Sequence, residues 1–120
     1  MKENATGVFQ GKIFVTSKAQ KTDGYQVSKG LLIGNESRFL TKPELEIYAD
    51  DVVCSHGSTS GAIDEDSLFY LNSRGVSKKE ATDMLILAFL DESVSEIESD
   101  SLADGVRELL RKSLETRNER

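Results

Sequence analysis

The sequence predicts a chain of mixed class, with β-strands in its first half and α-helices in its second half. Seven of the nine glycines and the only proline lie at or before Gly61, so turns are frequent up to this residue and rare beyond it. Apolar residues alternate with more polar ones within 7–15, whereas they recur every three or four positions within 81–89. We therefore expect two domains, residues 1–62 and residues 63–120.

The strands expected in the first half are short. Phe9, Ile13 and Val15 share one face of a strand at 7–15, because side chains two residues apart point the same way. Further apolar or alternating stretches lie at 31–33, 44–49 and 52–54. Strands of about three to six residues with wide turns between them are typical of a stacked β-solenoid or a small sandwich, and the residues alone leave both open.

Local signals mark the helices of the second half. Asp64 is a suitable N-cap for a short first helix, and Gly75 suits the left-handed turn that ends it. Ser77 and Glu80 form the pattern of a capping box, which predicts the start of a second helix.

The second helix has a wide apolar face, so we expect it to be buried on much of its circumference. Val94 and Ile97 are expected to continue it. A third helix is expected to be capped by Asp100 or Ser101 and to carry a charged outer face.

The charge of the chain excludes two classes of partner. Fifteen basic and 21 acidic side chains give a net charge of −6. A nucleic-acid-binding protein needs a basic face that displaces counterions from phosphates, and anionic lipid repels an acidic chain. No apolar run approaches the ~20 residues that span a bilayer. We therefore expect neither nucleic acid nor a membrane among the partners.

Cys54 and His56 are the only cysteine and the only histidine of the chain. A single cysteine excludes an internal disulfide and fits a reducing compartment. On an extended strand the two side chains would project from the same face, about 6.8 Å apart. A thiolate and an imidazole suit zinc, copper or iron–sulfur chemistry. Because two ligands do not fill a tetrahedral site, a stable site would need donors from another chain.

The residues alone also leave two other interpretations open. In the first, Cys54 is a small buried residue and His56 a hydrogen-bonding residue at a strand end, within an interaction domain that has no metal role. In the second, the two form a nucleophilic pair of an enzyme, although neighbours on one strand are poorly aimed for this chemistry.

One long run of the sequence resembles a known family. KPELEIYADDVVCSHGSTSGAIDEDSLFYLNSRGVSKKEA (42–81) is similar to the C-terminal signature of the SufB/SufD family, the scaffold subunits of the SUF iron–sulfur cluster assembly machinery. AQKTDGYQVSKGLLI (19–33) is similar to the preceding family segment. Cys54-Ser55-His56-Gly57 after IYADD resembles SufD more than SufB. Family members are several times longer, so the resemblance implies a C-terminal fragment of a SufD-like protein.

The resemblance implies the terminal rungs of a right-handed parallel β-helix followed by an α-helical C-terminal domain. It implies a scaffold that is not an enzyme, that pairs with SufB through the terminal strands and that docks the SufC ATPase on the helical domain. The expected location is the cytoplasm, or a plastid in a photosynthetic eukaryote. A fragment with an exposed strand edge is also a candidate for a homodimer.

The resemblance assigns roles to individual residues. His56 matches the SufD position implicated at the SufB–SufD interface, so we expect it to be a transient metal ligand there, with Cys54 beside it. An iron–sulfur cluster is expected only transiently at that interface, and none is expected to stay bound to this chain. The SufC contact is expected on the apolar residues Leu68, Phe69, Leu71, Met84, Leu85 and Phe89.

Overall fold

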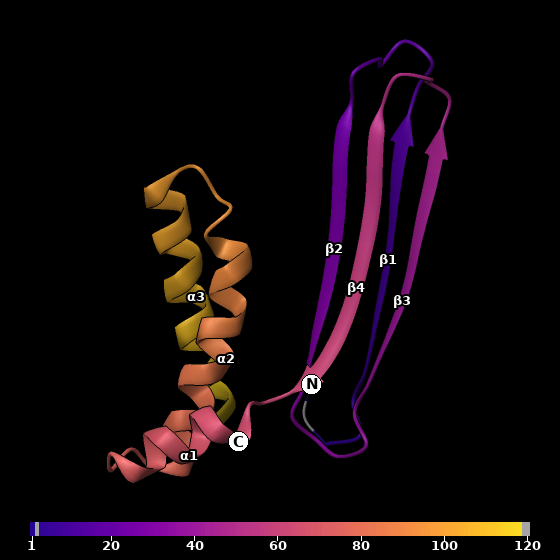
Figure 1. Cartoon of the computed structure of the whole chain (residues 1–120). Helices are drawn as coiled ribbons and strands as arrows, with labels where there is room; N and C mark the ends of the chain where they lie inside the picture. Colours follow the sequence, from indigo (N-terminus) through magenta and orange to yellow (C-terminus); the bar gives the residue numbers. More distant parts are fainter. Residues whose placement is uncertain (2, 119–120) are drawn as a thin grey trace. The chain divides into compact units, whose positions relative to one another are not determined.

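Four strands and then three helices follow one another in this computed structural model, which describes residues 1 and 3–118 (Figure 1). The strands are β1 (Thr6–Val15), β2 (Asp23–Leu32), β3 (Arg38–Ile47) and β4 (Val53–Ala62). The helices are α1 (Glu65–Ser73), α2 (Lys78–Val94) and α3 (Asp100–Asn118). The strands belong to one compact unit, Met1–Ala62, and the helices to a second, Ile63–Arg120. No helix in the described part of the chain is both long enough and apolar enough to cross a membrane.

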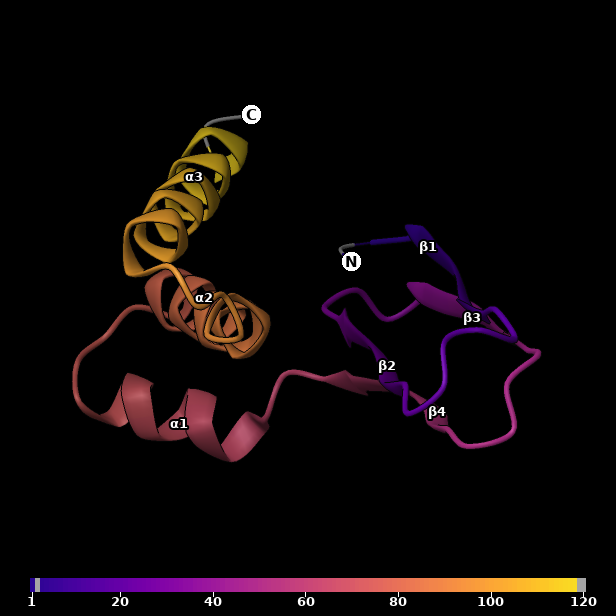
Figure 2. The same ribbon diagram turned by 90° about the horizontal axis from the view of Figure 1, so that it is seen from above.

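The strands form two parallel pairs. β1 pairs with β3, from Thr6 beside Arg38 to Val15 beside Ile47, and β2 pairs with β4. The chain alternates between the two sheets, so each sheet receives its second strand only after a complete coil of about 30 residues, the crossover that parallel strands require. β1 and β3 run in one direction and β2 and β4 in the other (Figure 1). Viewed along the strands, the two pairs lie as separate layers joined by turns (Figure 2).

Each strand has ten residues, so the expectation of strands of three to six residues was wrong. The apolar runs mark only parts of the strands. Most of β4, for example, is the polar and glycine-rich stretch 55–61. Its extended form is stabilised by the backbone ladder with β2, a partner 30 positions earlier in the chain, which no local pattern specifies.

The turns of the two coils are also stacked on one another. The backbone N–H of Lys21, after β1, donates a 2.7 Å hydrogen bond to the carbonyl of Asp51, after β3. The N–H of Asp51 donates to the side-chain oxygen of Gln20 at 2.9 Å. Lys21 adopts the left-handed conformation, with φ of 65°. The left-handed residue therefore lies where the two turns are hydrogen-bonded.

The caps predicted for α1 and α2 are confirmed. Asp64 accepts a 2.9 Å hydrogen bond from the N–H of Ser67. Gly75, with φ of 89°, ends α1, and the N–H of Val76 returns to the carbonyl of Leu71 at 3.2 Å. A capping box with both reciprocal hydrogen bonds opens α2.

Two expectations for α2 and α3 were wrong. α2 ends at Val94, so Ile97 does not continue it. α3 begins at Asp100 and its first hydrogen bond runs from Ala103 to the carbonyl of Ser99, so Ser99 precedes the helix where Asp100 or Ser101 was expected. Most apolar side chains of α2 are buried or half-buried, with α1 and α3 packed against the helix, whereas Met84 is 50% exposed. Among the side chains of this unit that the structure describes, the buried apolar ones are Ala81, Ile86, Val94, Ala103 and Leu114.

Candidate functional site

Cys54 and His56 lie near the start of β4, in register with two residues of β2. Cys54 is beside Gly24 and His56 is beside Gln26. The Cys54 sulfur faces Gly24, at 3.5 Å from the position that a Cβ there would occupy, and the side chain is half-buried. His56, two residues on, lies on the same face of the strand by the alternation of the pleat, and it is exposed.

This face of β4 belongs to the more open of the two coils. Within the described residues β3 pairs only with β1, and β4 only with β2, so both strands keep one unpaired edge. On β3 the side chains of Leu45 and Ile47 are 39% and 37% exposed, whereas Val15, the register partner of Ile47 on β1, is 3% exposed. His56 therefore lies on the coil whose interior is less covered.

The interior beside His56 is polar. Ser28 on β2 is buried, and its register partner is Ser58, the next residue on the His56 face of β4. The amide nitrogen of Gln26 is buried, has no hydrogen-bond partner among the described residues, and extends over Gly11 on β1. Gly11 leaves room for this amide, because a Cβ there would collide with it.

Two donor side chains are all that this site offers a metal ion. In the part of the chain that the structure describes, no group of three or more histidine, cysteine or acidic side chains is placed to hold a metal. Of the neighbouring carboxylates, Asp51 is engaged by the ammonium group of Lys21 at 2.6 Å. Cys54 and His56 can thus take up part of a coordination shell, with the remaining positions left to other molecules.

The six apolar residues predicted to contact SufC differ in their surroundings. Leu71 and Leu85 line a hollow of about 400 Å³ between α1 and α2. Met84 lines a different hollow, of about 530 Å³, between α2 and α3. Phe69 is 74% exposed on α1, whereas Leu68 and Phe89 are half-buried. The assignment of these residues to a partner contact stays a prediction.

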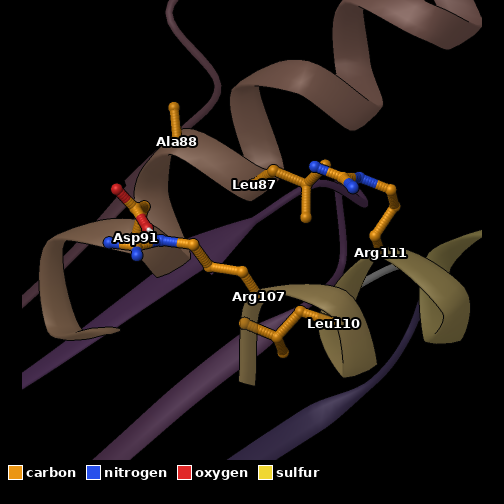
Figure 3. A pocket seen from close by; sticks show the side chains of 6 residues that line it. All are labelled: Leu87, Ala88, Asp91, Arg107, Leu110 and Arg111. Carbon is orange, nitrogen blue, oxygen red and sulfur yellow. Dashed lines mark hydrogen bonds and ion pairs between the residues drawn. The ribbon is translucent and has the colours of Figure 1, made fainter. Parts of the chain in front are cut away.

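A second hollow between α2 and α3 was not anticipated from the sequence. It has a volume of about 310 Å³ and contains Asp91, Arg107 and Arg111 among its lining residues (Figure 3). The Nε of Arg107 donates a 2.6 Å hydrogen bond to Asp91, which lowers the pKa of that carboxyl group. The available signal was the spacing of Arg107 and Arg111, four residues apart on one face of a helix.

Comparison with known proteins places the chain in a family. Residues 1–89 match the SufBD core domain of SUF system FeS cluster assembly. The iron–sulfur cluster assembly protein SufD of Escherichia coli K12 is 44% identical over 104 residues, which cover 87% of this chain and 25% of that protein. A SufBD family protein of Synechocystis is 42% identical over 106 residues, 88% of this chain and 23% of the relative.

A plant relative, the chloroplastic protein ABCI7 of Arabidopsis thaliana, is 36% identical over 100 residues, 83% of this chain and 21% of its own length. The chain spans about a quarter of the length of the curated relatives it matches. The match to the core-domain model covers most of the chain and includes both Cys54 and His56. This chain belongs to the SufB/SufD family of iron–sulfur cluster assembly proteins.

Proposed function

We propose that the chain is part of a SufD-like scaffold subunit that pairs with SufB and presents His56 to an iron–sulfur cluster during its assembly. The cluster is cargo in this proposal, and the chain itself catalyses no step. The observation that carries the proposal is the exposure of His56 on β4, a strand with an unpaired edge, two residues from a half-buried thiol. An imidazole that is accessible at such an edge can be reached by donors of a second polypeptide.

The arrangement of the strands supports the pairing. We propose that the two coils are terminal rungs of a right-handed parallel β-helix, since strands of two sheets alternate along the chain and pair in parallel after one coil. SufB would then meet the coil formed by β3 and β4, where Leu45 and Ile47 remain partly exposed. Unpaired strand edges and uncovered apolar side chains both favour association.

The helical unit is proposed to dock the SufC ATPase. Phe69 and Met84 are the two predicted contact residues with large exposed apolar surfaces, and no phosphate-binding loop is found in the sequence of this chain. ATP chemistry would therefore belong to the partner. The proposed location is the cytoplasm of a bacterium or, as for the plant relative named as chloroplastic, a plastid.

The role of His56 is tested by reconstituting clusters anaerobically on the complex of the whole subunit with SufB. We expect His56→Ala to reduce the cluster absorbance at least about threefold, while the Tm of the subunit changes little because substitutions of exposed residues cost about 0.5 kcal/mol or less. Ser58→Ala, the next exposed residue on the same face, is the matched control and should leave the yield unchanged. Equal yields for His56→Ala and Ser58→Ala would refute the assignment and favour a purely structural interaction domain.

Docking is tested separately by calorimetry with purified SufC. The full chain should bind with a Kd in the range of about tens of micromolar or tighter. Absence of binding at these concentrations contradicts the docking role but leaves the His56 assignment untouched, because the two tests use different units of the chain.

A further inference from the structure

An apolar groove follows the contact between α2 and α3. Two adjoining hollows, of about 310 and 530 Å³, share Leu87 and Arg111 in their walls. We define the seam groove by Met84 and Leu87 on α2 and by Leu110 and Leu114 on α3. These residues are three or four positions apart on their helices, so each pair lies on one helix face.

The larger of the two hollows in the seam groove, of about 530 Å³, is lined mostly by negatively charged groups among its ionisable residues. Three of its lining residues are the carboxylates Glu80, Asp83 and Glu115. Its single lining cation is Arg111, and this guanidinium already pairs with Glu108 at 3.2 Å. An occupant of this part therefore meets an apolar floor and an excess of carboxylates.

The geometry favours a helix as the occupant. α2 and α3 are joined by the short connection 95–99 and run antiparallel (Figure 1), and a third helix can pack into the groove that two such helices leave. The groove is lined by residues of α2 and α3 and by Gly75 and Val76 of the connection before α2, so it has no strand edge to pair with an extended peptide. A helix bound in the groove would cover the side chain of Met84, which is 50% exposed in this structure.

The charge argues against a second copy of this chain as the occupant. Residues 61–120 carry fourteen acidic and eight basic side chains, so two helical units repel one another. A partner with lysine or arginine residues beside its apolar stripe would be attracted.

We propose that the seam groove binds an amphipathic helix of a partner protein, with apolar residues over Met84, Leu87 and Leu114 and basic residues beside Asp83 and Glu115. The inference rests on the docking role proposed above for the helical unit and adds where the partner binds and which chemistry recognises it. Electrostatic attraction makes this binding sensitive to salt.

The test uses the full chain and three synthetic helical peptides of about 18 residues, followed by fluorescence anisotropy. The first has leucines at spacings of three and four with flanking lysines, the second has the same leucines with glutamates, and the third keeps the lysines but replaces the leucines by alanine. We expect the first peptide to bind at least about tenfold more tightly than either of the others, a difference that higher salt reduces. Equal affinity for all three, or binding of none, would overturn the inference.

Matched variants locate the binding. The double substitution Asp83→Asn with Glu115→Gln should weaken binding of the first peptide about three- to tenfold. Glu96→Gln with Glu98→Gln changes the charge equally in the exposed connection between α2 and α3 and should leave the affinity within about twofold. Met84→Ser should weaken binding, whereas Leu109→Ser, at a 69% exposed position of α3 outside the seam groove, should not. If a variant and its control change the affinity for the first peptide equally, the peptide binds elsewhere and the proposal is refuted.

The same variants separate this inference from the docking role. If SufC binds the chain and the Asp83 and Glu115 double substitution leaves that affinity unchanged, the groove inference fails and docking stands. If SufC does not bind the unaltered chain, docking itself fails. Circular dichroism of every variant establishes that the helices remain folded.

Discussion

The ring of Phe39 on β3 lies directly against the backbone of Gly30 on β2. Gly30 is buried, and a Cβ at this position would collide with the Cβ and ring carbons of Phe39. β2 belongs to the first coil and β3 to the second, and they lie in different sheets. The missing side chain at Gly30 thus allows the two sheets to approach each other.

Replacement of this glycine should therefore destabilise the β unit. We expect Gly30→Ala to lower the free energy of unfolding by about 1–3 kcal/mol, since a ring held between two sheets cannot move aside as a flexible side chain can. Gly61→Ala is the control, because no atom lies within 4 Å of a Cβ built there. Urea unfolding measures both variants, and similar midpoints for the two would contradict the steric role of Gly30.

A second prediction concerns the ion pair between α2 and α3. The Nε of Arg107 donates to Asp91 at 2.6 Å, and this hydrogen bond lowers the pKa of Asp91 and raises that of Arg107. Because the folded-state pKa of Asp91 lies below its ordinary 3.8, the pair stabilises the fold above that pH and loses its effect as the pH falls through the lower value. Asp91→Asn should therefore lower the Tm at pH 7.

The difference in Tm between Asp91→Asn and the unaltered chain should shrink as the pH is lowered below 3.8. Glu108→Gln is the control, since Glu108 pairs with Arg111 and Lys112 of its own helix and does not join α3 to α2. Thermal unfolding followed by circular dichroism gives both values. A difference that stays constant down to acid pH would show that the ion pair is not its cause.

A third prediction follows from the left-handed backbone of Lys21. A side chain with a Cβ is strained at φ of 65°, and glycine is not. The ammonium group of Lys21 pairs with Asp51, but both groups are largely exposed, so losing this pair costs little. Lys21→Gly should thus be neutral or should raise the free energy of unfolding by up to about 1 kcal/mol.

Lys18→Gly provides the comparison in the same turn, because the backbone of Lys18 is not left-handed. There, glycine only adds freedom to the unfolded chain and should destabilise by about 0.5 kcal/mol. Chemical unfolding ranks the two variants. A greater loss for Lys21→Gly than for Lys18→Gly would mean that the ion pair with Asp51 outweighs the strain.

A fourth prediction tests the capping box of α2. The hydroxyl of Ser77 accepts a hydrogen bond from the N–H of Glu80 at 3.2 Å, and the Glu80 carboxylate accepts from the N–H of Ser77 at the same distance. Ser77→Ala removes the cap and should reduce the free energy of unfolding by about 1 kcal/mol. Ser93→Ala, at an exposed position within α2, should instead be neutral or slightly stabilising, because alanine is the better helix former. Equal Tm values for the two variants would rule out the cap.

The helix boundaries at Asp64, Gly75 and Ser77 were predictable because capping depends on residues within one turn of each other. The boundary between α2 and α3 was not predicted correctly. Several serine and acidic residues between 95 and 101 are all competent to precede a helix, so local capping preferences did not single out Ser99.

The sequence predicted which two residues form the candidate site, but it did not predict how buried each of them is or which residues surround them. Alternation along a strand suffices to place Cys54 and His56 on one face. The half-buried thiol and the exposed imidazole depend on Gly24 and on the uncovered coil, which are set by pairing with strands distant in sequence. The seam groove was not predicted for the same reason. In the sequence, Met84 and Leu114 each fit the apolar face of an amphipathic helix, and no local pattern indicates that the two helices place them in one groove.

Sequence alone thus sufficed wherever the deciding interactions lie within a few residues: the order of strands and helices, the caps of α1 and α2, and the spacing of the two soft donors. Tertiary structure decided the length of the strands, their parallel pairing after a coil of about 30 residues, and which apolar side chains stay exposed. The physical reason is that ladder hydrogen bonds and burial are formed with partners remote in the chain, and these override weak local preferences such as those of the serine- and glycine-rich β4.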